Sequence, residues 1–270
     1  LDYLKSIMES IPGVAVNKDF SPICYFHNLS MWANQWHVGL NKIFNMLAGL
    51  KLRWLWAGLV IAGVIIVAIF WTGLCKFRTA VAGSIFISGA IEMVLQVVFL
   101  LSFQIIAGFV YRQLTLIIAF FMTGLAVGAG WMSRKDPSQM KTNVTRRIFI
   151  RVQVLVSMLP FGLILFFQLI HGDIQNFLAP AAMGWLFSGL SLITGILGGV
   201  HFSLAVMVMA GTGVALEKIG GGFYALDLAG AATGVLIAVL FILPIYGIMN
   251  TLVFLSTLSV ISLLTLLRRP

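Results

Sequence analysis

From residue 54 onward the chain alternates between long apolar runs and short polar or basic segments. A helix needs about 20 consecutive apolar residues to cross the hydrocarbon core of a bilayer, and each run has about that length. The pattern predicts seven transmembrane helices, over residues 54–75, 81–103, 113–133, 148–170, 183–212, 223–245 and 248–267. One choice stays open within 177–212, because Pro180 and the glycines at 195, 198 and 199 fit either one long helix or two short ones.

Residues 1–50 differ from the rest, because no apolar run in them is long enough to span a bilayer. Within 29–50 the apolar side chains recur at three- and four-residue steps, which indicates a helix with one apolar face. Trp32 and Trp36 on that face suit the headgroup layer and favour an interfacial helix. A core helix of a small soluble domain fits the same pattern. We therefore expect an all-α fold, with an extramembrane segment over 1–50 and a transmembrane helical bundle over 51–270.

Composition supports the membrane interpretation. The 270-residue chain is 60% hydrophobic and 9% charged, whereas a soluble domain carries about 25% charged residues. A soluble fold of this length could not cover so much apolar surface, because a single core stops growing at about this size. The net charge of +9 lies mostly in short clusters between apolar runs, as in membrane proteins. We expect the lipid bilayer as a partner and no nucleic acid.

The basic clusters also predict a topology. The segment 134–151 is rich in Lys and Arg, so the positive-inside rule places it in the cytoplasm. Seven spans put five further basic residues on the same side, namely Lys76, Arg78, Lys218, Arg268 and Arg269. We therefore expect a multi-pass protein of the cell (inner) membrane with its C-terminus in the cytoplasm and residues 1–50 on the other side.

Small residues at four-residue spacing occur in two of the expected helices. Gly124 and Gly128 lie in the third, and Gly230 and Gly234 lie in the sixth. Small side chains at this spacing let helix backbones approach closely in a membrane. The motif predicts a compact bundle and identifies no particular partner.

Two stretches carry more specific motifs. In the first, a small-residue helix contains Glu92, and the next helix ends in a Gly-Leu-x-x-Gly turn that begins at Gly124. In the second, Gly-x-x-Phe-x-Leu-Ala, Gly-x-x-Tyr-Ala-x-Asp-x-x-Gly-Ala-x-x-Gly and Leu-Pro-x-x-Gly begin at Gly199, Gly221 and Leu243. Together they resemble the transmembrane domain of membrane-fused spermidine synthase-like proteins, with Ser203 where that family usually has Pro.

The N-terminal segment extends the resemblance. Asn17, Asp19, Pro22 and Tyr25 match the sequence with which the family's synthase domain tends to end. The resemblance implies an aminopropyltransferase-like domain upstream, and since the chain begins at Leu1 without a signal peptide, we expect it to be part of a longer protein. A cytosolic synthase conflicts with a non-cytoplasmic N-terminal segment, so either the helix count is wrong or the attached domain is not a working cytosolic synthase.

Glu92 is the strongest candidate for a functional residue. A carboxylate within a span costs about 2.5–3.5 kcal/mol on insertion scales, so an intramembrane acid is functional by default. The functional hypotheses are a proton relay and the binding of a cation such as a polyamine. The structural alternative is a buried hydrogen bond between helices, with Gln96 one turn later as a partner.

Four further residues are candidates for binding a substrate or proton. Asp227 and its neighbour Tyr224 belong to the motif, but a position near the start of the sixth span also suits a helix-terminal carboxylate and an aromatic belt residue. Arg112 either anchors at the headgroups or pairs with an intramembrane acid. His201 is expected to be hydrogen-bonded, since a haem held by two histidines needs a second one at the same depth.

Three functions remain open. The chain is a membrane domain that anchors or serves a spermidine synthase-like domain, a transporter of a small cation such as a polyamine, or a non-catalytic subunit of a larger, possibly redox, membrane complex. The glycines at 195–199 fit the broken helices of transporters. With two cysteines, Cys24 and Cys75, and no zinc-ligand spacing or catalytic triad, the chain alone shows no catalytic site, metal site or cofactor.

Overall fold

The computed structural model describes residue 31 and residues 52–73, 76–107, 111–135, 142–170, 180–210 and 216–267. This part of the chain is helical and contains no strand, which confirms the all-α prediction. Its elements are α4 (Leu52–Trp71), α5 (Phe77–Ala107), α6 (Tyr111–Ser133), α7 (Thr142–Ile170), α8 (Pro180–Ala210), α9 (Leu216–Ile237), the π-helix η2 (Ala238–Ile242) and α10 (Leu243–Leu266). The interfacial helix expected over 29–50 lies outside the described residues, apart from Met31.

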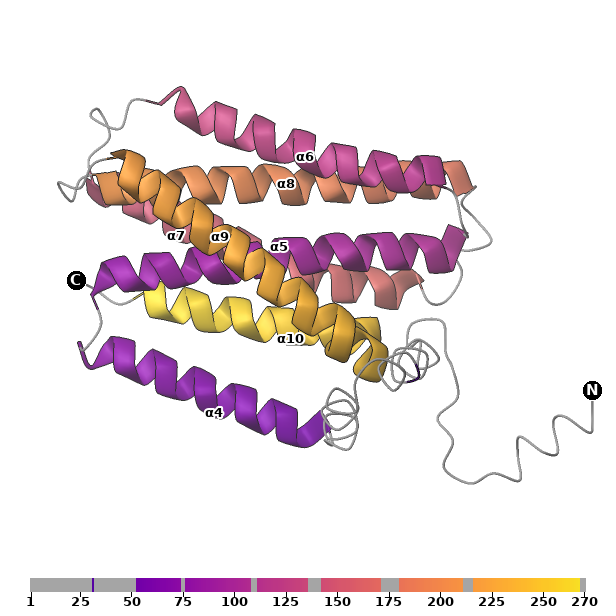
Figure 1. Cartoon of the computed structure of the whole chain (residues 1–270), viewed down its shortest axis with the longest axis horizontal. Coiled ribbons are helices and arrows are strands. Elements are labelled where there is room, and N and C mark those ends of the chain that lie inside the picture. The colour runs from indigo at the N-terminus through magenta and orange to yellow at the C-terminus, as the bar shows by residue number, and fades with distance from the viewer. Residues whose placement is uncertain are drawn as a thin grey trace, which may run out of the picture.

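Six continuous helical stretches are long and apolar enough to cross a membrane, so the chain is a multi-pass membrane protein. The last stretch, Glu217–Leu266, is 50 residues long. It holds both α9 and α10, which run in opposite directions and cross in Figure 1. The seven helical segments expected from the sequence are thus all present, the last two being joined without a loop.

The reversal between α9 and α10 is made by the Leu-Pro-x-x-Gly motif. Gly247 has φ 79° and ψ 176°, a backbone conformation that side chains with a Cβ rarely adopt. The π-helix η2 ends at Ile242, directly before the motif, and Pro244 contributes no N–H to the helix ladder. The turn therefore depends on Gly247, and the Thr251 hydroxyl donates to its carbonyl oxygen at 2.8 Å.

The structure corrects one expected helix boundary and decides the choice that the sequence left open within 177–212. The basic segment 134–151 is not a loop throughout, because α7 already begins at Thr142 and includes Arg146, Arg147 and Arg151. The stretch 177–212 contains one helix, α8, which continues through the glycines at 195–199 and through Ser203. The glycines do not interrupt α8 because they face neighbouring helices, which fill the space beside them.

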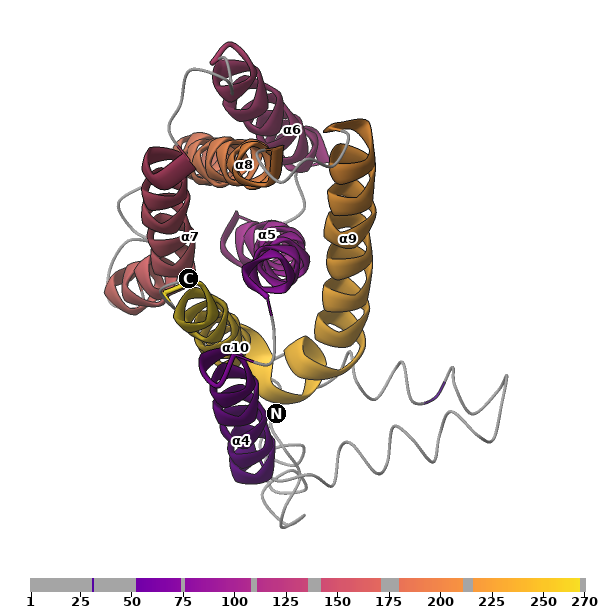
Figure 2. The ribbon, with the colours of Figure 1, turned by 90° about the vertical axis from the view of Figure 1, so that its left-hand side faces the viewer.

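The centre of the bundle is α5. Viewed along the helices in Figure 2, α5 is surrounded by α7, α8, α9 and α10. Within its apolar part 67% of the residues are buried, compared with 6% in α4. Two clusters of buried side chains extend from α5, one around Phe99 and Phe187 and one around Ile85 and Phe149. Polar groups in the middle of α5, such as Glu92 and Gln96, are therefore interior groups.

The helices α6 and α8 meet through glycines on both sides. A Cβ on Gly124 would lie 2.9 Å from the Ile196 nitrogen, and one on Gly195 would lie 3.0 Å from the Leu125 nitrogen. Gly128 and Gly199 contact backbone of the facing helix in the same way. The prediction that the glycine pair in α6 is a packing motif is confirmed.

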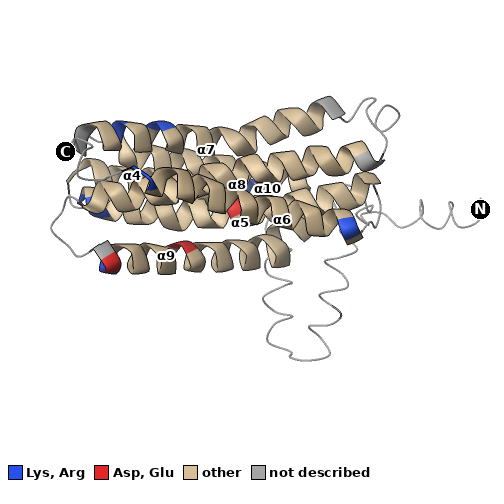
Figure 3. Cartoon of the chain, turned by 90° about the horizontal axis from the view of Figure 1, so that it is seen from above, with Lys and Arg blue, Asp and Glu red and all other residues tan. Residues whose placement is uncertain are grey.

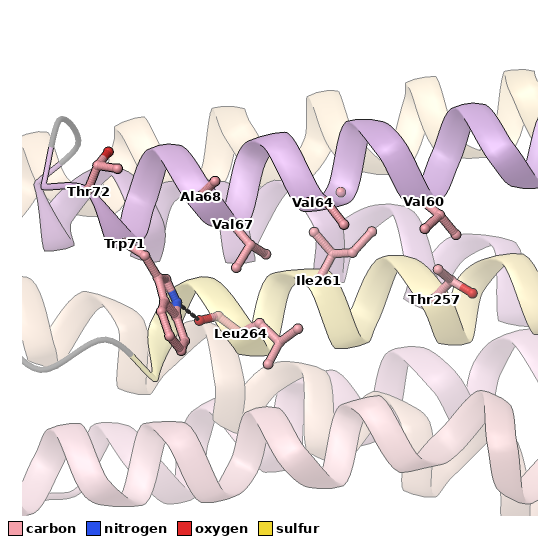
Figure 4. A pocket seen from close by; sticks show the side chains of 10 residues that line it. Val60, Val64, Val67, Ala68, Trp71, Thr72, Thr257, Ile261 and Leu264 are labelled. Carbon is pink, nitrogen blue, oxygen red and sulfur yellow. Dashed lines mark hydrogen bonds between the residues drawn. The ribbon is translucent and has the colours of Figure 1, made fainter.

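The first described helix, α4, lies at the edge of the bundle on α10 (Figures 1 and 4). A Cβ on Gly63 would lie 2.9 Å from Cγ1 of Ile261, so the two helices approach closely there. Near the end of α4 the Trp71 indole N–H donates to the Leu264 carbonyl at 3.3 Å. Between these contacts lies an apolar groove of about 580 Å³, seen from close by in Figure 4.

Basic residues gather at one end of the bundle (Figure 3). The guanidinium of Arg146, at the start of α7, lies 4.5 Å from the ring centre of Phe77, which begins α5. The segments around Lys76 and Arg146 therefore share one end, and α10 also finishes there (Figure 1). Successive helices therefore run in opposite directions between the two ends of the bundle.

Candidate intramembrane acidic site

Glu92 lies at the midpoint of α5, which runs from Phe77 to Ala107. Fifteen residues separate it from either end, or about 22 Å at 1.5 Å per residue. Its side chain is buried, with 7% of its surface exposed. The carboxylate lies directly against Gly198 of α8, where a Cβ would overlap it and come within 2.7 Å of Oε1. The missing side chain of Gly198 therefore makes the space that the carboxylate occupies.

Asp227 approaches the same part of α5 from α9. A Cβ on Gly89 would lie 2.6 Å from Oδ1 of Asp227 and 3.1 Å from its carbonyl carbon. Gly89 precedes Glu92 by three residues, so the two positions are neighbours on the surface of α5. The carboxylates of Glu92 and Asp227 are close enough to interact electrostatically. Two acids from different helices thus share one region in the middle of the bundle.

The position of Asp227 corrects an expectation from the sequence. Its helix begins at Leu216, not at residue 223, so Asp227 stands about three turns inside α9. The additional turns are formed by Glu217, Lys218 and the three glycines at 220–222. The helix dipole acts within the first turn, so it does not explain this carboxylate.

Two glycines of the same motif hold α9 against α5. A Cβ on Gly230 would overlap the Phe86 carbonyl group, and one on Gly234 would lie 2.6 Å from Cβ of Ala90. These contacts confirm the second predicted packing motif. They also bring together the two sequence stretches that carry the resemblance, with Asp227 one turn before the contact at Gly230.

Gln96 does not bond to Glu92, contrary to the structural alternative. Its side-chain oxygen accepts a hydrogen bond from the Ser191 hydroxyl at 2.8 Å, and that hydroxyl also lies 2.8 Å from the Ile117 carbonyl oxygen. The side-chain nitrogen of Gln96 has no partner among the described residues. Gln96 thus links α5 to α8 one turn away from the acids and leaves the Glu92 carboxylate to other partners.

His201 is fully buried on α8, three residues after Gly198. Its ring stacks on Phe149 of α7, with centroids 4.9 Å apart and an interplanar angle of 21°. Neither ring nitrogen has a hydrogen-bond partner in the described part of the chain, so the expectation of a hydrogen-bonded histidine was wrong. Stacking fixes the ring without satisfying its polar atoms.

The remaining two candidates are exposed residues. Arg112 is exposed in the first turn of α6, which follows the far end of α5. It is therefore about 20 Å from the depth of Glu92 along the helix axis and does not reach it. Tyr224 is 62% exposed on α9, three residues before Asp227. Arg112 therefore lies outside the acidic site, and Tyr224 lies at its exposed side.

The site can bind a positive charge or a proton. Its described residues offer carboxylates and an imidazole but no nucleophile with an adjacent base, and no group of three His, Cys, Asp or Glu side chains in the described ranges could hold a metal ion. Sequence reasoning missed Gly198 and Gly89 as the contacts of the two acids. The sequence did hold a signal for Gly198. Gly195 and Gly199 are four residues apart and share one face of the helix, whereas Gly198 lies on another face and must pack against a different helix.

Comparison with known proteins adds no relative: no protein family, curated protein or solved structure matches the chain.

Proposed function

We propose that the chain is the membrane domain of a spermidine synthase-like fusion protein and that it serves this protein by binding an amine cation between Glu92 and Asp227. The observation that supports the proposal is that Asp227 of α9 packs on Gly89 of α5, three residues from the buried Glu92. Both acids belong to the stretches that carry the resemblance.

The basic residues of α7 lie too far from Glu92 to neutralise it. The deepest basic residue of α7 is Arg151, five residues or about 8 Å further into the bundle than Arg146. Arg146 is level with Phe77, from which Glu92 is about 22 Å distant along α5. An ionised carboxylate at this depth needs a partner of opposite sign, and a cation from outside the described residues would supply it.

A polyamine has the chemistry that this site requires. It carries several ammonium groups joined by methylene chains, so one molecule can pair with both carboxylates while its carbon atoms contact the apolar walls. Glycines at 89 and 198 keep the walls close to the acids. A single metal cation would instead need several oxygen ligands in a closed shell.

The test is a binding measurement with radiolabelled spermidine on the purified chain in lipid nanodiscs. Glu92→Gln and Asp227→Asn each remove one charge and are expected to weaken binding about tenfold or more, the equivalent of about 1.4 kcal/mol. Glu217→Gln is the matched control, because this acid lies on α9 but is exposed in its first turn. Equal binding by all three variants would contradict the proposal.

The orientation is part of the same proposal. The basic end of the bundle is placed in the cytoplasm, with residues 1–50 on the opposite side. A reporter fused after Pro270 that is active only in the cytoplasm is the expected result. Activity of this fusion only outside the cell would reverse the orientation and would also remove the conflict with a cytosolic synthase domain.

One feature favours a second candidate, a non-catalytic subunit of a membrane complex. α4 is apolar on all sides, and large side chains such as Val64 and Ile65 are more than half exposed. Extraction in a mild detergent would then give an assembly with stoichiometric partner subunits. The fusion-protein proposal expects the chain to be extracted together with its synthase-like domain and no other subunit.

A further inference from the structure

A groove of about 740 Å³ runs along the outer face of α6. Its described lining comes from one side of that helix, from Met122 near the middle to Arg134 just past the end: Met122, Thr123, Ala126, Val127, Gly130, Trp131 and Arg134. This face is separate from the acidic site, because α6 contacts α8 through its opposite face at Gly124 and Gly128. The groove therefore faces the lipid.

Gly130 deepens the groove without a role in helix packing. A Cβ at this position would have no neighbour within 4 Å, in contrast to Gly124 and Gly128 on the same helix. A glycine in a helix costs about 1 kcal/mol relative to alanine. The contacts between the described helices do not explain why this position is a glycine, whereas a molecule bound in the groove would explain it.

The end of the groove is basic and aromatic. Arg134 lines it and is exposed. The ammonium of the adjacent Lys135 lies 5.2 Å from the ring centre of Trp131, which also lines the groove. Trp at a helix end is typical of the headgroup layer. Two cations therefore stand where the headgroup of a lipid would be, above an apolar channel.

We propose that this groove binds an anionic phospholipid, with one acyl chain between Met122 and Gly130 and the phosphate at Arg134 and Lys135. The lining extends over twelve helical steps from Met122 to Arg134, or about 18 Å. One leaflet of the hydrocarbon core is about 15 Å deep. An acyl chain lying along α6 thus reaches from the basic end to the bilayer centre.

The groove between α4 and α10, of about 580 Å³, provides a comparison within the molecule. It is also apolar and opens to lipid, but its described lining in Figure 4 includes no charged residue. The acyl chain of any lipid can lie there, because the described lining offers no charged side chain to select a headgroup. Selectivity for an anionic lipid is therefore expected from the α6 groove alone.

The experiment measures lipid binding to the full chain by native mass spectrometry, with phosphatidylglycerol and phosphatidylcholine of identical acyl chains. Arg134→Gln is expected to weaken phosphatidylglycerol binding about fivefold, since one basic residue near an anionic surface contributes about 1 kcal/mol. Arg112→Gln is the charge-matched control, because Arg112 is exposed at the other end of the same helix. It is expected to leave binding unchanged.

A second pair of variants tests the groove itself. Gly130→Leu fills it and is expected to abolish the selective site, while Gly83→Leu adds the same side chain at an exposed glycine on α5 that has no neighbour within 4 Å. Soluble glycerol phosphate is expected not to compete, because it lacks the acyl chain. Equal binding of both lipids, equal loss in the two arginine variants, or competition by glycerol phosphate would each overturn the proposal.

Discussion

Replacing Gly198 by alanine tests whether the Glu92 carboxylate occupies the space that the glycine leaves. The new Cβ would overlap the carboxylate, so either the Glu92 side chain or the two helices must move. Inserting a methyl group into a packed interior costs about 1–3 kcal/mol. The same substitution favours the helix by up to about 1 kcal/mol, so the net effect is a loss of about 0–2 kcal/mol.

Gly83→Ala separates these two contributions. Gly83 lies inside α5 and is exposed, and a Cβ there meets nothing within 4 Å, so only the helix-favouring contribution applies. Gly198→Ala should therefore be less stable than Gly83→Ala by about 1–3 kcal/mol. Unfolding of the purified chain in mixed micelles, followed by circular dichroism during a titration with sodium dodecyl sulfate, gives the two free energies.

A double-mutant cycle then identifies the colliding group. If the carboxylate is the obstacle, Gly198→Ala costs less in a Glu92→Ala background, with a coupling energy of about 0.5–3 kcal/mol. Equal stability of Gly198→Ala and Gly83→Ala, or a cost that is unchanged when Glu92 is removed, would refute the placement of Glu92 against α8.

Three further predictions use the same unfolding assay. Gly247→Ala should lose about 1–3 kcal/mol, because its positive φ with ψ near 180° strains any residue with a Cβ; a cost near zero would mean that the turn between α9 and α10 is formed differently. Ser191→Ala should lose about 1–3 kcal/mol by leaving the buried Gln96 side chain without its hydrogen bond, and unchanged stability would argue against that bond. Gly124→Leu should prevent α6 from approaching α8 and lower stability by more than the same change at the exposed Gly83, and the reverse order would contradict the glycine contact.

Much of the fold follows from the sequence because a bilayer constrains a helix strongly. Apolar length fixes the spans to within a few residues, and α6 ends at Ser133, as expected. Boundaries failed where polar residues continue a helix beyond the apolar run, as at Thr142 of α7 and Leu216 of α9. Helix hydrogen bonds extend past the hydrocarbon core, and hydropathy does not detect that extension.

The acidic site was only half predictable. Glu92 and Asp227 stand out in the sequence, because a carboxylate in an apolar run is costly. Their meeting depends on which face of α5 contacts α9, and this is set by Gly89, Gly230 and Gly234 together. Spacing within one helix cannot show which helix lies opposite. The lack of a hydrogen-bond partner for His201 among the described residues was unpredictable for the same reason, since stacking on Phe149 is a contact between α8 and α7.

The charge and the shape of Glu92 can be separated by a single variant, and this decides between a structural and a binding role. Glu92→Gln keeps the shape against Gly198 and removes the charge, for which the described residues provide no cation at that depth. Because a buried charge is costlier than a buried amide, the variant should be at least as stable as the parent chain while it binds spermidine more weakly. Stability and binding would then move in opposite directions, as expected when a charge is kept for a ligand. If Glu92→Gln loses stability and binding together, the carboxylate instead holds the helices in place, and the weaker binding follows from the loss of structure.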